Sequence, residues 1–168
     1  MSATGRGAPA QSATADREIV ISRVISAPRE LVFEAFTEVR HLSRWWGPEG
    51  FTSPACTMDV RVGGRFLWCM RSAKGQEYWN TGVFREIVPL ERLVYTDSFA
   101  DPQGNVVPAS HYGFTEPMPL ESLITVTFAE QDGRTTMTVR HAMPPGRMAD
   151  MTRAGWNTSF DKLAASLG

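Results

Sequence analysis

The sequence predicts an α+β fold with the element order strand, two helices, six strands and one long helix. Three observations support this order. Between Phe51 and about His141, apolar and polar residues alternate in short runs separated by turn residues, which is typical of antiparallel strands. From about Arg147 onward, apolar residues recur at helical spacing. Two short helical segments precede Gly47 and Pro48, which end the second of them.

Length and charge narrow the classes of protein. The 168 residues fit one domain, expected over 18–168, after an N-terminal tail of residues 1–17 whose Ala, Gly, Ser and Thr content predicts disorder. The chain has 17 basic and 18 acidic residues and a net charge of -1, so we expect neither a nucleic acid nor a membrane as partner. A signal peptide and a membrane-spanning run are not visible, which predicts a cytoplasmic protein.

The first elements follow from local signals. Residues 18–26 are rich in β-branched residues and predict the first strand. Ser26 is expected to cap a helix that carries Pro28 in its first turn. A second helix over residues 37–46 ends in two adjacent tryptophans, Trp45 and Trp46, just before the Gly-Pro pair.

The strands that follow are expected at about 51–62, 66–73, 77–88, 92–99, 121–130 and 134–142. In the first hairpin, a two-residue loop at the glycine pair would send the two apolar sets to opposite faces. A three-residue loop over Gly63, Gly64 and Arg65 instead pairs Val62 with Phe66 and keeps both sets on one face. Cys56 then falls on the inner face and Cys69 on the outer one, so a disulfide between them is not expected.

Two polar residues fall within apolar rows of these strands. Asp97 shares a face with Tyr95 and Phe99 unless a β-bulge rotates it outward, and His141 ends the inward row of the last strand. Between these strands, residues 100–120 are rich in Pro and Gly. We expect this long segment to form a mobile cover over a binding site.

At this point the sequence resembles a known family. The segments ISAPRELVFEAFTEVRHLSRWWGPEGF, MDVRVGGRF, GVFREIVPLERLVYT, GRTTMTVRH and GWNTSFDKLAASL are similar to the START-like helix-grip (SRPBCC) superfamily, in the branch named for activators of the heat-shock protein 90 ATPase. The resemblance implies a curved antiparallel sheet of six to seven strands wrapped around a long C-terminal helix, with two short helices after strand one and a cavity between sheet and helix.

The cavity implied by this resemblance gives the aromatic residues a candidate role. Both tryptophans of the WWGP segment could belong to the core, or one could anchor the helix while Trp46 lines the cavity. The candidate ligand-binding residues share an inward position, an aromatic or adaptable side chain, or a polar group: Trp46, Met58, Phe66, Trp68, Met70, Tyr95, His111, Tyr112, His141, Trp156 and Phe160.

Three functions stay open, because this fold serves many functions. We favour binding of a small apolar or aromatic molecule in the cavity, without a cofactor. The first alternative is a cyclase- or hydrolase-type enzyme in which His141, with Asp97, exchanges protons with the ligand. The second is a cochaperone-like interaction domain, and the sequence leaves a chaperone contact and a homodimer open. The histidines and cysteines lack metal-ligand spacing, so no metal site is expected.

Overall fold

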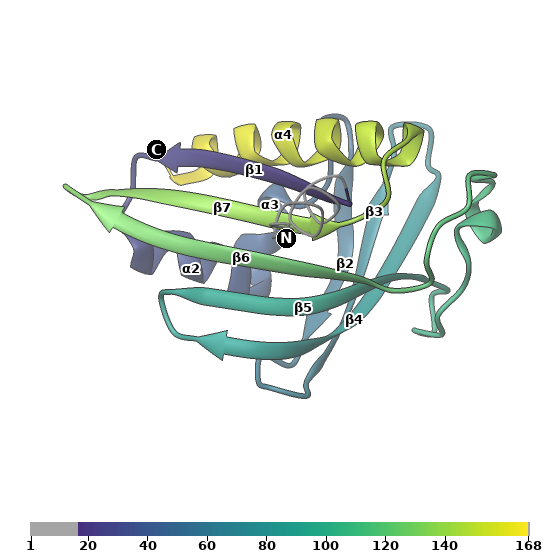
Figure 1. The fold of residues 1–168 in the computed structure, drawn as a ribbon, viewed down its shortest axis with the longest axis horizontal. Helices are drawn as coiled ribbons and strands as arrows, with labels where there is room; N and C mark the ends of the chain where they lie inside the picture. The colour runs from purple at the N-terminus through teal and green to yellow at the C-terminus, as the bar shows by residue number, and fades with distance from the viewer. Residues whose placement is uncertain (1–16, 168) are drawn as a thin grey trace, which may run out of the picture.

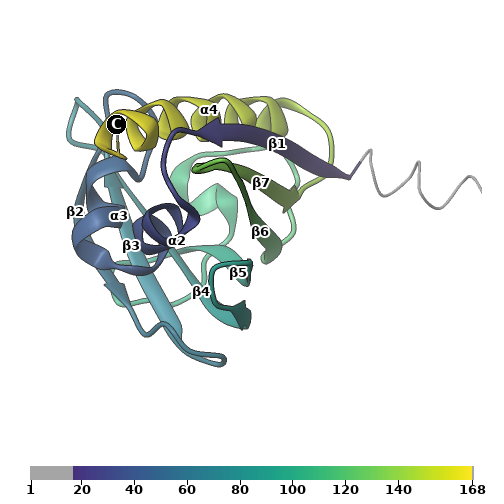
Figure 2. The same ribbon diagram turned by 90° about the vertical axis from the view of Figure 1, so that its left-hand side faces the viewer.

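The computed structural model describes residues 17–167 of the chain. A seven-stranded antiparallel sheet curves around the long C-terminal helix, and two short helices close one end of the curve (Figure 1, Figure 2). The predicted fold class is therefore confirmed. The expected disordered tail of residues 1–17 lies, apart from Arg17, outside the described residues.

Most element bounds follow the predicted ranges within two residues, but the strand expected at 51–62 ends at Met58. The strands are β1 (Glu18–Ile25), β2 (Thr52–Met58), β3 (Arg65–Arg71), β4 (Glu77–Val88), β5 (Arg92–Ala100), β6 (Ser122–Gln131) and β7 (Arg134–Ala142). The helices are α2 (Arg29–Thr37), α3 (Val39–Trp45) and α4 (Arg147–Leu167), with a 3₁₀ turn, η1, at Ala109–Tyr112. The expected cap by Ser26 is wrong, because α2 starts after Pro28 without a side-chain cap, and Glu130 of β6 accepts the hydrogen bond from the Arg29 N–H at 2.8 Å.

The sheet order is β1-β7-β6-β5-β4-β3-β2, so the first two strands of the chain lie at opposite edges. Helices α2 and α3 carry the chain from one edge to the other, and the remaining strands then return as a meander. Helix α4 lies across the open side of the curved sheet, where it contacts β1 and the two short helices (Figure 2). This arrangement places the core between the concave face of the sheet and the helices.

The register of the first hairpin differs from the expected one. Met58 pairs with Phe66 and Cys56 with Trp68, so the connection spans residues 59–64 and the expected three-residue loop is wrong. The glycine pair joins β4 instead: the Gly63 N–H donates to the Phe84 carbonyl (2.8 Å), and the Phe84 N–H donates to the Gly64 carbonyl (3.0 Å). Phe66 pairs with Met58 instead of the expected Val62, a register shift by an even number of residues, so the apolar residues stay on the inner face.

Glycine is required at position 64 by a close backbone approach. A Cβ atom there would lie 2.0 Å from the Asp59 carbonyl oxygen, because the Gly64 N–H closes a tight turn onto Arg61. Cys69 does face away from the inner row, but it is fully buried, with 0% of its surface exposed, whereas Cys56 is partly exposed. Both cysteines are free.

An aromatic core fills the end of the fold near α2 and α3. Trp45 is completely buried, and its Nε1–H donates to the Ala35 carbonyl at 2.9 Å. Its ring contacts Phe36 at a centroid distance of 4.8 Å and Phe160 of α4 at 6.1 Å. Trp45 therefore joins both short helices to α4 and is the anchoring member of the tryptophan pair.

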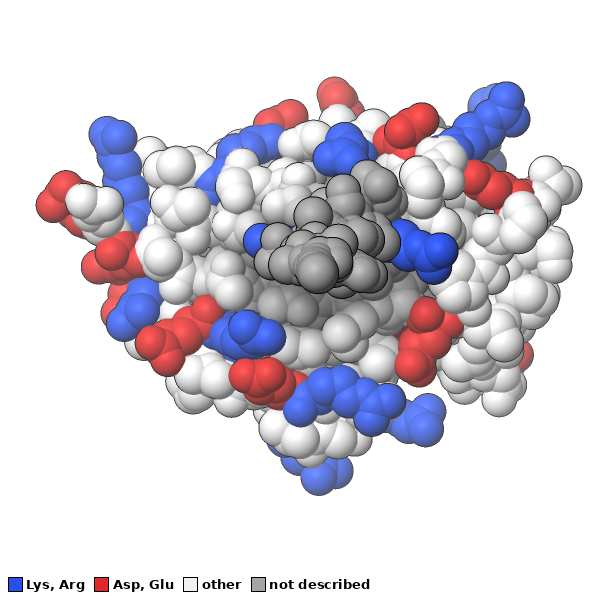
Figure 3. All heavy atoms as spheres, viewed as in Figure 1, with Lys and Arg blue, Asp and Glu red and all other residues white. Residues whose placement is uncertain are grey.

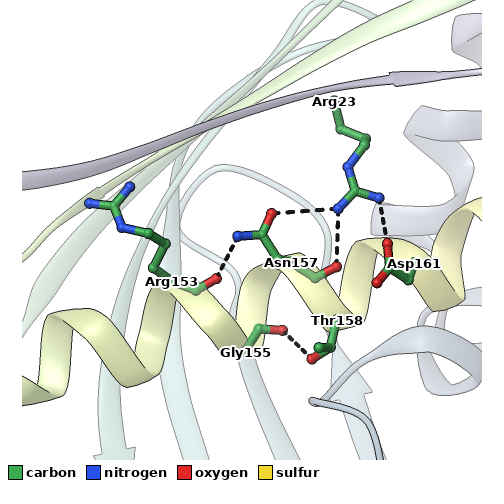
Figure 4. Close-up of polar contacts among 6 residues, drawn as sticks. All are labelled: Arg23, Arg153, Gly155, Asn157, Thr158 and Asp161. Carbon is green, nitrogen blue, oxygen red and sulfur yellow. Dashed lines mark hydrogen bonds and ion pairs between the residues drawn. The ribbon is translucent and has the colours of Figure 1, made fainter.

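A polar contact joins α4 to β1. The guanidinium of Arg23 on β1 donates to the Asp161 carboxylate (2.8 Å) and to the Asn157 carbonyl (3.2 Å), as Figure 4 shows. Residues 157 and 161 are one turn apart on the same helix face. Because this face is held against β1, the neighbouring Trp156 and Ser159 are directed toward the concave side of the sheet.

Candidate functional site

A cavity of about 290 Å³ lies between the concave face of the sheet, α4 and the segment that follows β5. Its wall is mostly apolar. The strands and the α3–β2 and β7–α4 connections contribute Trp46, Gly47, Pro48, Phe51, Met70, Tyr78, Asn80, Asp97, Ser98, Phe99, Ser122, Ile124, His141 and Met143. Helix α4 contributes Met148, Met151, Thr152, Gly155, Trp156 and Ser159, and the segment after β5 contributes Val107, Ala109, Phe114, Met118, Pro119 and Leu120.

Some sequence-predicted site residues meet in this wall and others do not. Trp46, Met70, Asp97, His141 and Trp156 line the cavity. The other candidates lie outside the wall. Buried core positions are held by Phe66, Trp68, Tyr95 and Phe160, Met58 packs against that core, and His111 and Tyr112 lie on η1.

Trp68 lies behind Trp46 as seen from the cavity. The two rings are 4.3 Å apart between centroids, and Trp68 also stacks on Phe66 at 3.9 Å. Trp46 in turn contacts Trp156 of α4 at 5.5 Å. The second tryptophan of the WWGP segment thus forms cavity wall, and the layer beneath it supports its position.

His141 carries a fixed tautomer. The Trp156 Nε1–H donates to His141 Nδ1 at 3.1 Å, so this nitrogen must accept. Only 4% of the histidine surface is exposed, and burial lowers its pKa from 6.5 to about 4. The ring is therefore neutral at pH 7 and carries its proton on Nε2, which is buried and has no hydrogen-bond partner among the described residues.

Among the described residues that line the cavity, Asp97 supplies the one carboxylate. Asn80 Nδ2 donates to Asp97 Oδ1 at 3.2 Å, and burial raises the pKa of this carboxyl from 3.8 to about 7. The β-bulge of β4 falls between Phe84 and Glu86, beyond the Asn80–Phe99 pair, so it does not rotate Asp97 outward. The carboxylate consequently remains on the inner face.

The segment between β5 and β6 covers part of the cavity and is tied at several points. The Tyr112 hydroxyl accepts from the Trp79 N–H (3.1 Å) and donates to the Ala100 carbonyl, which inserts it between β4 and β5. Further along, the Glu116 carboxylate accepts from the Arg147 N–H (3.1 Å) and the Met148 N–H (2.6 Å) at the start of α4. Glu116 therefore joins the cover to the helix that forms the opposite side of the mouth.

Removing this carboxylate is expected to loosen the cover. In Glu116→Ala, two N–H groups of the first helical turn lose their acceptor, which costs about 1 kcal/mol of stability. Hydrogen exchange should become faster in residues 113–120 and in the first turn of α4. Glu121→Ala, in the same segment and exposed, is the matched control and should change neither. Exchange as slow as in the sheet, in the wild type and in Glu116→Ala, would contradict a mobile cover.

Several wall residues were not among the sequence-predicted site residues. Asn80, Tyr78 and Phe114 are examples, and only the first two carry a signal in the sequence, since they alternate with outward residues along β4. Phe114 belongs to an irregular segment without periodicity. Its ring lies on Phe99 at 5.6 Å, a contact that depends on how the segment folds back.

Other kinds of site have little support in residues 17–167. No cluster of three or more His, Cys, Asp or Glu there could hold a metal ion. None of the helices in the same range combines the length and hydrophobicity that crossing a bilayer requires. Basic and acidic side chains are interspersed on the face that Figure 3 shows, so this face has no extended patch of one sign.

The curved antiparallel sheet, the long helix across it and the cavity between them define a START-like helix-grip protein of the SRPBCC superfamily. Residues 26–168 match the family model described as "Activator of Hsp90 ATPase homolog 1-like protein", so the chain belongs to this family. The family and its fold support a ligand-binding or cochaperone-like domain.

Solved structures show the same fold. Protein CV1439 from Chromobacterium violaceum is 30% identical, with a TM-score of 0.72, and the match covers 90% of this chain and 96% of that one. A protein from Arthrobacter aurescens is 23% identical over 92% and 87% of the two chains, with a TM-score of 0.75. The AHSA1 protein from Silicibacter pomeroyi is 24% identical over 89% and 96%, with a TM-score of 0.70. The search of curated proteins gave no match.

Proposed function

We propose that the chain binds a small, mostly apolar molecule in the cavity between the sheet and α4. The observation that carries this proposal is the mostly apolar cavity, whose wall includes His141 with a buried Nε2–H that has no partner among the described residues. Leaving such a donor unpaired costs about 1–3 kcal/mol, and an acceptor on a bound molecule would recover this energy. Trp46 Nε1 in the same wall, also buried and without a partner in residues 17–167, adds a second donor.

The wall chemistry favours a ligand with an uncharged acceptor, such as a carbonyl or ether oxygen, on an apolar body. Methionines at positions 70, 118, 143, 148 and 151 adapt to different shapes, which suits such a body. Leu120 and Met151 are exposed apolar residues at the mouth and give the ligand an apolar entrance.

The enzyme alternative in which His141 acts as acid or base has weaker support. A general base needs a free lone pair and a pKa near the working pH. In His141 the Nδ1 lone pair is occupied by Trp156, and the lowered pKa makes the ring a poor proton acceptor at pH 7. This arrangement suits hydrogen-bond donation to a ligand. The chaperone contact, the homodimer and the cytoplasmic location stay predictions from the sequence.

A matched pair of helix variants tests the cavity. N-phenylnaphthylamine, a neutral apolar dye that brightens when it leaves water, should bind the wild type saturably at one site. Thr152 lines the cavity on α4, whereas Ala154, two residues away, is exposed. Thr152→Trp fills part of the cavity and should weaken dye binding by about tenfold or more, equivalent to about 1.4 kcal/mol. Ala154→Trp adds the same side chain to the outer side of the helix and should change binding by less than about twofold.

Fluorescence titration measures both affinities, and circular dichroism checks that both variants are folded. Equal affinities of the two variants would place the dye outside the cavity. Absence of saturable binding by the wild type would contradict the proposed function.

A further inference from the structure

Within residues 17–167, Asp97 is a carboxylate without a countercharge in a mostly apolar cavity. Its single hydrogen bond among residues 17–167 comes from Asn80 Nδ2 to Oδ1, and no ion pair in that part of the chain includes it. None of the described residues that line the cavity is Lys or Arg. A buried carboxylate normally requires a partner of opposite charge, since its removal from water is costly.

The surroundings of Asp97 are aromatic. Tyr78 on β4, Phe99 on β5 and Phe114 in the cover line the cavity with it. The Phe99 and Phe114 rings are 5.6 Å apart, and the Tyr78 and Phe114 rings are 6.1 Å apart. Aromatic rings attract ammonium groups that lie against them, so this wall is compatible with a cation beside the carboxylate.

Asp97 and the free donor of His141 lie at different places along the wall. Ile124 of β6 pairs with His141 on one side and with Tyr95 on the other, and Asp97 is two residues beyond Tyr95. Two strand spacings and two residues of rise separate the Cα atoms of Asp97 and His141 by roughly 12 Å. One small molecule can therefore reach both groups, with an apolar body between its polar ends.

We propose that the ligand of this cavity is an apolar amine whose protonated nitrogen pairs with Asp97. The inference rests on the proposed function, because it assigns one end of the same ligand. The ammonium group donates to the free Oδ2 of Asp97, and the rest of the molecule occupies the space that Met70, Met118 and Ile124 border. His141 then meets an acceptor at the far end.

The protonation state of Asp97 gives this proposal a pH signature. Its pKa is raised to about 7, so the carboxyl changes from mostly neutral to mostly ionised between pH 6 and pH 8. Besides Asp97, the titratable side chains among the described residues of the wall are those of Tyr78 on β4 and His141 on β7, and Tyr95 precedes Asp97 by two residues on β5. His141 stays neutral over this range because its pKa is lowered to about 4, and burial raises the pKa of Tyr95 well above 10.0. An alkylamine stays protonated throughout.

The experiment compares phenylbutylamine with phenylbutanol, which have the same shape and differ in charge. The affinity of each compound is measured by its displacement of N-phenylnaphthylamine from the wild type, from Asp97→Asn and from Asp150→Asn. Asp150→Asn is the control, because it removes an exposed carboxylate in the first turn of α4. At pH 8 the wild type should bind the amine about tenfold more tightly than the alcohol. Asp97→Asn, which can keep the contact with Asn80, should abolish this preference, and Asp150→Asn should keep it. Lowering the pH to 6 should weaken amine binding about tenfold in the wild type and leave the alcohol unchanged.

Equal affinities for amine and alcohol, or a preference that survives Asp97→Asn, would overturn the amine assignment. In that case dye binding that is sensitive to Thr152→Trp would still support the proposed function. If the dye does not bind the wild type, the proposed function is contradicted, and the amine assignment, which rests on it, is contradicted with it.

Discussion

Trp45→Ala is expected to lower the free energy of unfolding by about 3–5 kcal/mol, the cost of truncating a fully buried tryptophan. The side chain has no exposed surface and touches the core from both short helices and α4. Its loss also leaves the Ala35 carbonyl without its donor. Urea unfolding followed by circular dichroism measures the change.

The adjacent Trp46→Ala is the matched control. Trp46 is partly exposed to the cavity, and its Nε1–H has no partner to lose, so the stability cost should be clearly smaller than for Trp45→Ala. The same variant should weaken dye binding, because it removes cavity wall. If both variants cost the same stability and Trp46→Ala leaves binding intact, both tryptophans belong to the core and the assignment of the pair is wrong.

The fold was predictable from the sequence because its signals are local. Alternation along β3, β5 and β7 identifies strands without knowledge of their partners. The α4 stripe identifies the gripping helix in the same way, since Trp156, Phe160 and Leu163 recur at helical spacing and are buried. Motif resemblance then supplied how these elements are arranged.

The register of the first hairpin was not predictable from its own residues. Gly63 and Gly64 indicate a tight turn when the hairpin is considered alone. The Gly64 N–H does close a turn onto Arg61, but the Gly63 N–H and the Gly64 carbonyl bond to Phe84, about twenty residues further along the chain, which a local argument does not include. A long-range contact therefore decided the loop length. The apolar residues still lie on the inner face, because the register differs from the expected one by an even number of residues.

The site was predictable only in part for a related reason. Sequence patterns show which residues face inward, and Trp68 and Trp46 both do. Sequence patterns do not show which inward residues are covered by others. That depends on the curvature of the sheet and on the distance between the sheet and α4. Trp68 is covered by Trp46, and Tyr95 lies in the core, whereas Asp97, two residues along the same strand, reaches the cavity.

His141 and Asp97 are expected to make opposite contributions to the pH dependence of stability. The pKa of His141 falls from 6.5 to about 4 on folding, so the unfolded chain binds the extra proton in this window and stability is lost as the pH falls. The size is about 3 kcal/mol. The pKa of Asp97 rises from 3.8 to about 7, so the folded chain binds the extra proton and stability is lost as the pH rises. This contribution is at most about 4 kcal/mol, because Asp97 faces the cavity rather than close-packed atoms.

Single variants should separate these two contributions, which largely cancel in the wild type between pH 4 and pH 7. Asp97→Asn removes the gain at low pH, so its stability relative to the wild type should fall by up to about 4 kcal/mol over that range as the pH is lowered. His141→Gln can still accept the hydrogen bond from Trp156, but it removes the loss of stability that His141 causes at low pH. Its stability relative to the wild type should therefore rise by about 3 kcal/mol as the pH is lowered over the same range. The double variant should return to within about 1 kcal/mol of the wild-type pH profile if the two contributions add. Urea unfolding at several pH values measures all four proteins, and shifts of the same sign in both single variants would show that these two side chains are not the buried groups that titrate.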